Sequence, residues 1–167
     1  GLKKFIAHGY DPELGWIRKP NTSKIESSKL GVIKFEIDGD GARRNVRHDK
    51  LQKLISCYGD SYTFARQVND NETWEWYLSE ITNSNVLNFG VGNYCAGQTL
   101  IRLKREYPQN PTKIVIIGVV PSTIARILGV WKHYHDYGNT FGFKPVYILG
   151  EDGKVNLVPN PIDSPDK

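Results

Sequence analysis

The stretch LISCYGDSYTFARQV, residues 54–68, decides the fold. It opens with the apolar run LISCY at 54–58, which is too short for a helix and ends at once in Gly59, so it predicts a buried strand. Ser61 follows where this strand leads into a turn. Such a turn can lift a hydroxyl out of a sheet beside free backbone N–H groups, which suits a nucleophile. Gly-Asp-Ser is equally ordinary turn chemistry, so the tripeptide alone leaves both interpretations open.

Strands and helices are expected to alternate after this stretch. The apolar segments 86–91 and 113–120 predict two further strands. Amphipathic helices are predicted between and after them, with Arg102 on an outward face. The apolar stripes of these helices are Trp74, Tyr77, Leu78 and Ile81; then Leu100, Leu103 and Tyr107; then Ile124, Ile127, Leu128 and Trp131. Near-continuous apolar strands separated by such helices predict an α/β fold with a parallel sheet covered on both faces.

Three polar loops follow the three predicted strands. They contain Ser61, the segment 90–93 and Pro121-Ser122-Thr123. In parallel sheets, ligands bind beyond the carboxyl ends of the strands. We therefore expect the three loops to meet at one edge of the sheet, with the Ser61 hydroxyl facing a cleft between them.

The two ends of the chain differ from this pattern. Residues 1–50 predict an extended, β-containing lead-in that packs on an α/β domain at 51–167, with Trp16 and Ile17 as its apolar anchor. Alternating residues at 30–38 predict one strand in this lead-in, followed by a turn. The segments 146–149 and 155–158 flank a turn rich in Asp and Gly, which predicts a C-terminal β-hairpin.

Composition bounds the class of protein. The chain has 167 residues, of which 39% are apolar and 24% charged, as expected for one soluble globular domain. Its net charge of +4 arises in residues 1–50, around Lys3-Lys4 and 43–47. A nucleic-acid surface needs a denser basic stripe with interleaved aromatic residues, so we expect a solvated face and no nucleic-acid partner.

Neither a metal nor a cofactor is expected. Cys57 lies inside a predicted strand, and Cys95 follows a Gly-rich loop where it could be exposed, but the two form no disulfide framework or metal-ligand spacing. No apolar run is long enough to span a membrane. The chain begins at Gly1 without a signal peptide or any Met, so we expect it to be trimmed. The compartment, bacterial cytoplasm or cell envelope, and the oligomeric state are left open.

With the loops placed, residues 54–130 resemble the SGNH/GDSL hydrolase superfamily. The first block is matched by Gly59-Asp60-Ser61-Tyr62-Thr63 after an apolar strand, and the second by NFGVGN at 88–93 before a helix. The segments DPELGW at 11–16 and GAR at 41–43 are similar to a bacterial subgroup. The resemblance implies a flavodoxin-like three-layer α/β/α sandwich and hydrolysis of an ester through a serine nucleophile.

The resemblance also implies roles for individual residues. Ser61 would be the nucleophile, and its backbone N–H one donor of the oxyanion hole. The second donor would be the backbone N–H of Gly92 or Asn93. Gly59 and Asp60 would support the turn. In the third block Ser122 stands where the family has an Asn whose side chain completes the oxyanion hole, and losing such a donor costs about 10²–10³-fold in rate.

The base that would activate the serine has no match in the sequence. The family places it in an Asp-x-x-His block near the C-terminus, whereas His8 and His48 precede Ser61, and His133 and His135 lack an Asp at that spacing. We expect the chain to stop before this block. A local base at His133 or His135 is the alternative, against a plain polar and aromatic surface at these positions.

Three functions follow from these residues. The first is a serine esterase that hydrolyses an O-acyl ester of a small molecule or glycan, such as an O-acetyl carbohydrate. The second is a catalytically impaired binding or assembly module of the same fold. The third is an O-acyltransferase that uses the same serine, since hydrolysis and transfer share the acyl-enzyme.

Overall fold

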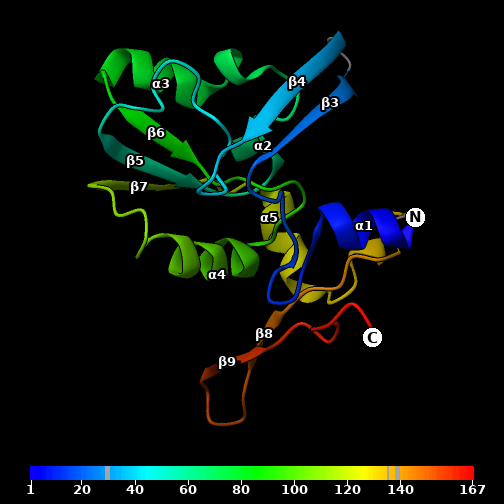
Figure 1. Ribbon diagram of the computed structural model, residues 1–167. Helices are drawn as coiled ribbons and strands as arrows, with labels where there is room; N and C mark the ends of the chain where they lie inside the picture. The colour runs from blue at the N-terminus through cyan, green and yellow to red at the C-terminus, as the bar shows by residue number, and fades with distance from the viewer. Residues whose placement is uncertain (29–30, 135, 138–139) are drawn as a thin grey trace.

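The computed structural model describes residues 1–28, 31–134, 136–137 and 140–167. Its centre is a parallel sheet in the order β6-β5-β7, with β5 (Lys53–Tyr58) between β6 (Asn85–Asn88) and β7 (Ile114–Ile117). Helices α3 (Trp74–Thr82) and α4 (Ala96–Glu106) lie on opposite faces of this sheet (Figure 1). The three predicted parallel strands are confirmed. The fold is mixed α/β, with several small antiparallel sheets around the parallel one.

Burial within the sheet is uneven. Ile55 and Cys57 of β5 and Val86 of β6 are buried together, because these two strands have helices on both faces. Burial also raises the pKa of the Cys57 thiol. In the described part of the chain β7 pairs with β5 alone, and Ile117 is 50% exposed. The expectation that every strand is covered on both faces is therefore wrong for β7, the edge strand.

Helix α3 buries a polar face instead of its predicted apolar stripe. Thr73 caps the helix by accepting a hydrogen bond from Trp76 N over 3.1 Å. The buried residues are Glu75 and Ser79, whereas Ile81 is 81% exposed. The reason is the lead-in, since Asn45 Nδ2 donates to Ser79 Oγ over 2.6 Å. A polar segment beneath the helix thus selects the polar face.

Arg102 of α4 faces inward, contrary to its predicted outward position. Its Nη2 donates to Gly41 O over 2.7 Å, and its guanidinium lies 5.4 Å from the Phe89 ring centroid. Desolvation by this burial lowers the pKa of Arg102. Leu100, predicted to face inward, is exposed.

The third predicted helix is shorter than its apolar stripe. It consists of α5 (Pro121–Ala125) and a 3-10 turn, η2 (Arg126–Leu128), and it ends at Gly129, whose backbone is extended. Leu128 is 89% exposed, so the stripe does not cover the sheet. Trp131 lies beyond the helix and stacks on Phe143, with 5.9 Å between ring centroids. A further 3-10 turn, η3 (Lys132–Tyr134), follows.

The lead-in contains more regular structure than predicted. It begins with α1 (Leu2–His8), β1 (Tyr10–Asp11) and β2 (Gly15–Trp16), and continues in an antiparallel hairpin of β3 (Thr22–Ser28) and β4 (Gly31–Ile37). Only the second strand of that hairpin was predicted. Strand β3, TSKIESS, has no alternating apolar pattern, so its structure depends on pairing with β4. Ile33, Phe35 and Ile37 form the buried face of β4.

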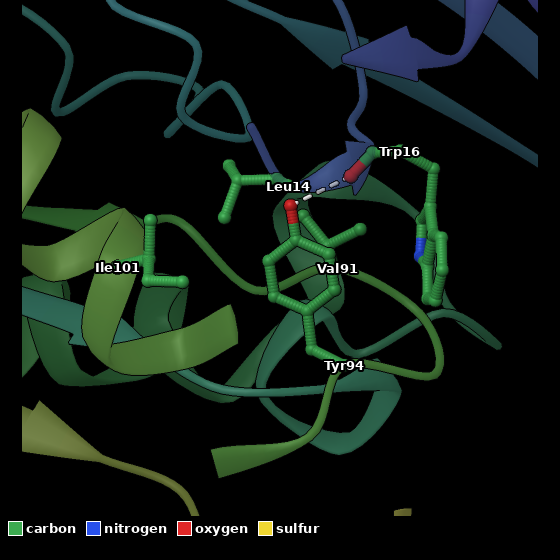
Figure 2. Close-up of a cluster of buried hydrophobic side chains, with 5 residues drawn as sticks. All are labelled: Leu14, Trp16, Val91, Tyr94 and Ile101. Atoms are coloured by element: carbon green, nitrogen blue, oxygen red, sulfur yellow. Dashed lines mark hydrogen bonds between the residues drawn. The ribbon is translucent and has the colours of Figure 1, made fainter. Parts of the chain in front are cut away.

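Trp16 anchors the lead-in to the sheet domain, as predicted. Figure 2 shows it beside Tyr94, which follows β6, in a buried cluster with Leu14, Val91 and Ile101. The Tyr94 hydroxyl donates to Trp16 O over 2.7 Å, and the two rings meet edge to face at 6.0 Å. This cluster joins the first sixteen residues to the loop after β6 and to α4.

The expectation of a solvated basic face is wrong for Arg43. The residue is buried, and its Nε donates to Asp70 Oδ1 over 2.7 Å. Its other nitrogens donate to the carbonyl oxygens of Phe64, Ala65 and Val68. Arg43 thus binds the lead-in to α2 (Ser61–Phe64) and to the 3-10 turn η1 (Asp70–Glu72).

The predicted C-terminal hairpin is confirmed. Its strands, β8 (Val146–Leu149) and β9 (Val155–Val158), pair antiparallel from Val146↔Val158 to Leu149↔Val155. Among the described residues, none of the helices is long and apolar enough to cross a membrane.

Candidate active site

The loops at the carboxyl ends of β5, β6 and β7 lie against one another. Val91 N donates to Gly59 O over 3.0 Å, and Gly118 N donates to Tyr58 O over 2.8 Å. The packing leaves no room for side chains at two glycines. A Cβ on Gly90 would lie 2.3 Å from Phe64 N, and one on Gly59 would lie 2.1 Å from Thr63 Oγ1. The parallel topology thus brings together the three loops that the sequence singled out.

Asp60 connects several segments at this edge. It is 1% exposed, and its Oδ1 accepts a hydrogen bond from Tyr62 N over 2.9 Å, which supports the turn at Ser61. Its Oδ2 accepts from Arg126 Nη1 over 3.0 Å and from Thr123 Oγ1 over 3.4 Å. One carboxylate therefore links the first loop to the third.

Arg126 was not among the residues that the sequence indicated. Its signal was indirect, because an Asp that follows a central buried strand needs a cation or several donors to offset its desolvation. Arg126 satisfies this need from the turn after α5, and it also donates to Tyr94 O over 3.4 Å. It thereby contacts elements that follow all three parallel strands.

Ser61 is the first residue of α2 and is half-buried. Within the described residues, the backbone N–H groups of Ser61, Gly92 and Asn93 donate no hydrogen bond. The loops that carry them are joined by the hydrogen bond from Val91 N to Gly59 O. An oxyanion hole needs N–H donors of this kind directed at the oxygen that becomes negatively charged.

Thr123 is the buried, hydrogen-bonded residue of the third loop, whereas Ser122 is only half-buried. Ser122 is half-buried on α5, whereas Thr123 is fully buried. Thr123 Oγ1 reaches Asp60 and accepts from Val120 N over 3.2 Å. Thr123, the residue after the expected oxyanion donor Ser122, is thus the one that contacts the first loop at Asp60.

Asn93 is held from the segment that follows α5. Its backbone is left-handed, with φ 64°, and its Nδ2 donates to Asp136 Oδ2 over 2.9 Å. Asp136 also pairs with Lys132 Nζ at 3.4 Å. Desolvation by burial lowers the pKa of Lys132. Trp16 Nε1 fixes the neighbouring carbonyl of Gly92 over 3.0 Å, so the loop is clamped from both sides.

The histidines occupy different places. His133 stacks on Trp131 at 4.6 Å and contacts the Tyr137 ring at 4.8 Å. In the described ranges, no hydrogen bond joins His133 to Ser61. His135, the other candidate base, lies outside the described residues. His48 is buried beside α3, where its Nε2 lies 2.8 Å from Glu80 Oε1.

A cavity of about 920 Å³ adjoins the second loop. It lies among α1, β2, β3 and residues 91–93, and Asn93 and Asp136 are part of its wall. Of the described residues that line it, none is Ser61 or Ser122. This cavity therefore opens beside the expected second oxyanion donor and not beside Ser61, and the expected cleft between the three loops stays a prediction. The lead-in, whose helix and hairpin the sequence did not predict, supplies most of the wall of the cavity.

The described residues form no metal site, and Cys95 has a structural role. Among the described residues, no group of three His, Cys, Asp or Glu side chains is positioned to hold a metal ion. Cys95 is buried instead of exposed, because it caps α4, where its Sγ accepts from Gln98 N over 3.5 Å.

A scan of the chain against models of protein families finds no match, and a search among curated proteins finds no significant match.

Proposed function

We propose that this chain carries the nucleophile of an SGNH/GDSL-type serine esterase that acts on the O-acyl ester of a small molecule or glycan. The observation that carries the proposal is that, within the described residues, the N–H groups of Ser61, Gly92 and Asn93 donate no hydrogen bond, on two loops that are joined by the bond from Val91 N to Gly59 O. The resemblance of 59–63 and 88–93 to the first two blocks of that superfamily supports the same assignment.

The fold supports the proposal at a coarser level. The order β6-β5-β7 puts the strand that precedes Ser61 at the centre of the sheet, with α3 and α4 on opposite faces (Figure 1). This arrangement is compatible with a flavodoxin-like three-layer sandwich, which we propose as the complete fold. Ser61 then lies beyond the carboxyl end of the central strand, where sheets of this class bind ligands.

The proposed reaction has two steps. Ser61 Oγ attacks the ester carbonyl carbon while the base takes the hydroxyl proton, and the N–H groups of Ser61 and Asn93 stabilise the oxyanion. The intermediate then collapses to an acyl-serine, and the alcohol leaves with the proton from the base. Water hydrolyses the acyl-serine to the acid and restores the hydroxyl. An O-acyltransferase would differ only in this last acceptor, a sugar hydroxyl in place of water.

The resemblance implies that the base is the histidine of an Asp-x-x-His segment, and His133 or His135 is the alternative within these residues. Without a base within hydrogen-bond reach, a serine hydroxyl is a weak nucleophile at neutral pH. Asp60 is not a substitute, because its carboxylate is buried and engaged by Arg126, Thr123 and the backbone of Tyr62.

One observation favours the second candidate, a binding module whose serine is catalytically impaired. The large cavity is bordered by Gly92 and Asn93 but not by Ser61. A ligand seated there would contact the second loop and the lead-in without needing the hydroxyl.

Labelling with a fluorophosphonate probe separates the two candidates. The longest natural form of the protein that contains this sequence should be labelled, and Ser61→Ala should abolish the labelling. Ser27→Ala is the matched control, because Ser27 is an exposed serine on β3. Hydrolysis of p-nitrophenyl acetate should follow the same pattern. Equal labelling of Ser61→Ala, or no labelling of the folded natural protein, would contradict the esterase and support the binding module.

A further inference from the structure

The cavity beside residues 91–93 has an excess of positive charge. Among its described lining residues, Glu26 and Asp136 are the carboxylates. The cationic side chains outnumber them three to one and come from α1, the segment after β2, β3, the segment after α2, and η3. They are Lys4, Arg18, Lys19, Lys24, Arg66 and Lys132.

Arg18 forms the rigid part of one wall. Its guanidinium carbon lies 4.3 Å from the ring centroids of both Phe35 and Phe64, so two aromatic faces hold the group in place. Within the described residues its Nε is buried without a hydrogen-bond partner. Burial lowers the pKa of Arg18 to about 10, so the group remains charged at neutral pH. A guanidinium held in place by two rings contributes a permanent positive charge to this wall.

Glu26 does not neutralise this wall. Its carboxylate is shared by Lys24, by Arg66 at 3.2 Å and by Arg18 at 3.6 Å. One negative charge among three cations leaves a net positive wall, and a bound anion would complete its neutralisation.

Lys132 is a cation of the lining near Trp16 and Asn93. Lys132 Nζ lies 5.0 Å from the Trp16 ring centroid. A small second cavity shares Trp16, Asn93, Lys132 and Asp136 with the large one and adds Arg126 and Lys144. Lys144 is buried, and desolvation lowers its pKa. Because Lys132 pairs with Asp136 and Arg126 pairs with Asp60, Lys144 is the further cation that the small cavity adds beside Asn93.

We propose that this cavity is a binding site for an anionic ligand with two or more carboxylate or phosphate groups. The volume of about 920 Å³ is that of an oligosaccharide- or nucleotide-sized ligand rather than a single small ion. The cations come from five different segments around the cavity, so a ligand with separated negative charges would match them. The binding does not depend on the chemistry of Ser61.

Isothermal titration calorimetry at low salt tests this site with three probes. A galacturonic acid trisaccharide carries carboxylates, inorganic pyrophosphate carries phosphates, and a galactose trisaccharide is the neutral control. At least one anionic probe should bind, and added salt should weaken it. Tighter binding of the galacturonic acid trisaccharide would indicate a carboxylate ligand, and tighter binding of pyrophosphate would indicate a phosphate ligand.

Paired variants place the binding in the cavity. Lys4→Gln/Arg66→Gln removes two exposed lining cations and should weaken binding by about tenfold or more. Arg44→Gln/Lys104→Gln removes the same charge at exposed positions outside the lining and should change it by less than about twofold. Thermal melting of both variants checks that they fold.

Several results would overturn the proposal. They are an equal loss of affinity in both double variants, equal binding of the neutral trisaccharide, or no binding of either anion to the folded protein. Ser61→Ala should bind the anion as the unmodified chain does. This result would keep the anion site separate from the proposed esterase, since either can fail while the other holds.

Discussion

Arg126 Nη1 donates a hydrogen bond to Asp60 Oδ2 over 3.0 Å, and this contact joins the loop after β5 to the turn after α5. The pair is largely buried, with Asp60 only 1% exposed. The carboxylate also holds the backbone of Tyr62, so the ion pair positions the residues on either side of Ser61. Its loss would therefore affect both stability and the candidate nucleophile.

Arg126→Met should lower the free energy of unfolding by about 2–3 kcal/mol. The substitution keeps the apolar length of the side chain but leaves the Asp60 carboxylate buried without its cation, which is costly in a protein interior. Urea denaturation followed by tryptophan fluorescence measures the change. Arg44→Met is the control, because its ion pair with Glu36 is exposed and should contribute less than about 1 kcal/mol. An equal loss of unfolding free energy in the two variants would show that the buried pair of Asp60 and Arg126 stabilises the protein no more than an exposed ion pair does.

Glu75→Gln should stabilise the protein at pH 8. Burial raises the pKa of the Glu75 carboxyl from its ordinary 4.5 to about 8, because desolvation outweighs the opposing effects of Arg43, Asn88 and Thr73. The folded chain therefore retains a proton that the unfolded chain releases near pH 4.5. Stability should fall as the pH rises from about 4.5 to about 8 and level off above it, by on the order of 3–5 kcal/mol.

Urea denaturation at a series of pH values between 4.5 and 8.5 measures this slope. Glu75→Gln removes the titrating group. The free energy of unfolding of this variant should therefore lose the part of the pH dependence that Glu75 contributes. Glu151→Gln, in the exposed turn between β8 and β9, should retain the full slope. A slope unchanged in Glu75→Gln would refute the assignment to this carboxyl.

Gly90→Ala should destabilise the protein, whereas Gly92→Ala should not. A methyl group on Gly90 would meet Phe64 N at 2.3 Å, where the second loop packs on α2, and backbone cannot yield easily there. Nothing lies within 4 Å of the same group on Gly92. We expect a loss of about 2 kcal/mol or more for the first variant and less than about 0.5 kcal/mol for the second. Thermal melting of the two variants compares them, and similar melting temperatures would contradict the close approach of the loop to α2.

The sequence by itself determined the parallel sheet and the C-terminal hairpin. The short apolar runs at 54–58 and 114–117, each followed by Gly, indicate strands because they are too short for helices, although β7 at the edge of the sheet stays largely exposed. The Asp- and Gly-rich turn at 150–153 specifies the hairpin because its residues favour turn conformations. The meeting of the three loops follows from parallel topology alone, since successive parallel strands end at the same edge.

Only the tertiary structure decided which faces are buried and where the cavity lies. A side-chain pattern shows that a helix is amphipathic, but burial depends on what lies opposite. Asn45 therefore turns Glu75 and Ser79 of α3 inward, and Gly41 draws Arg102 into the core. The cavity wall combines α1, β3 and residues 91–93, which are distant in sequence. Long-range contacts of this kind leave no local signal, so the pairing of Asp60 with Arg126 and the cationic cavity emerge only when the chain is folded.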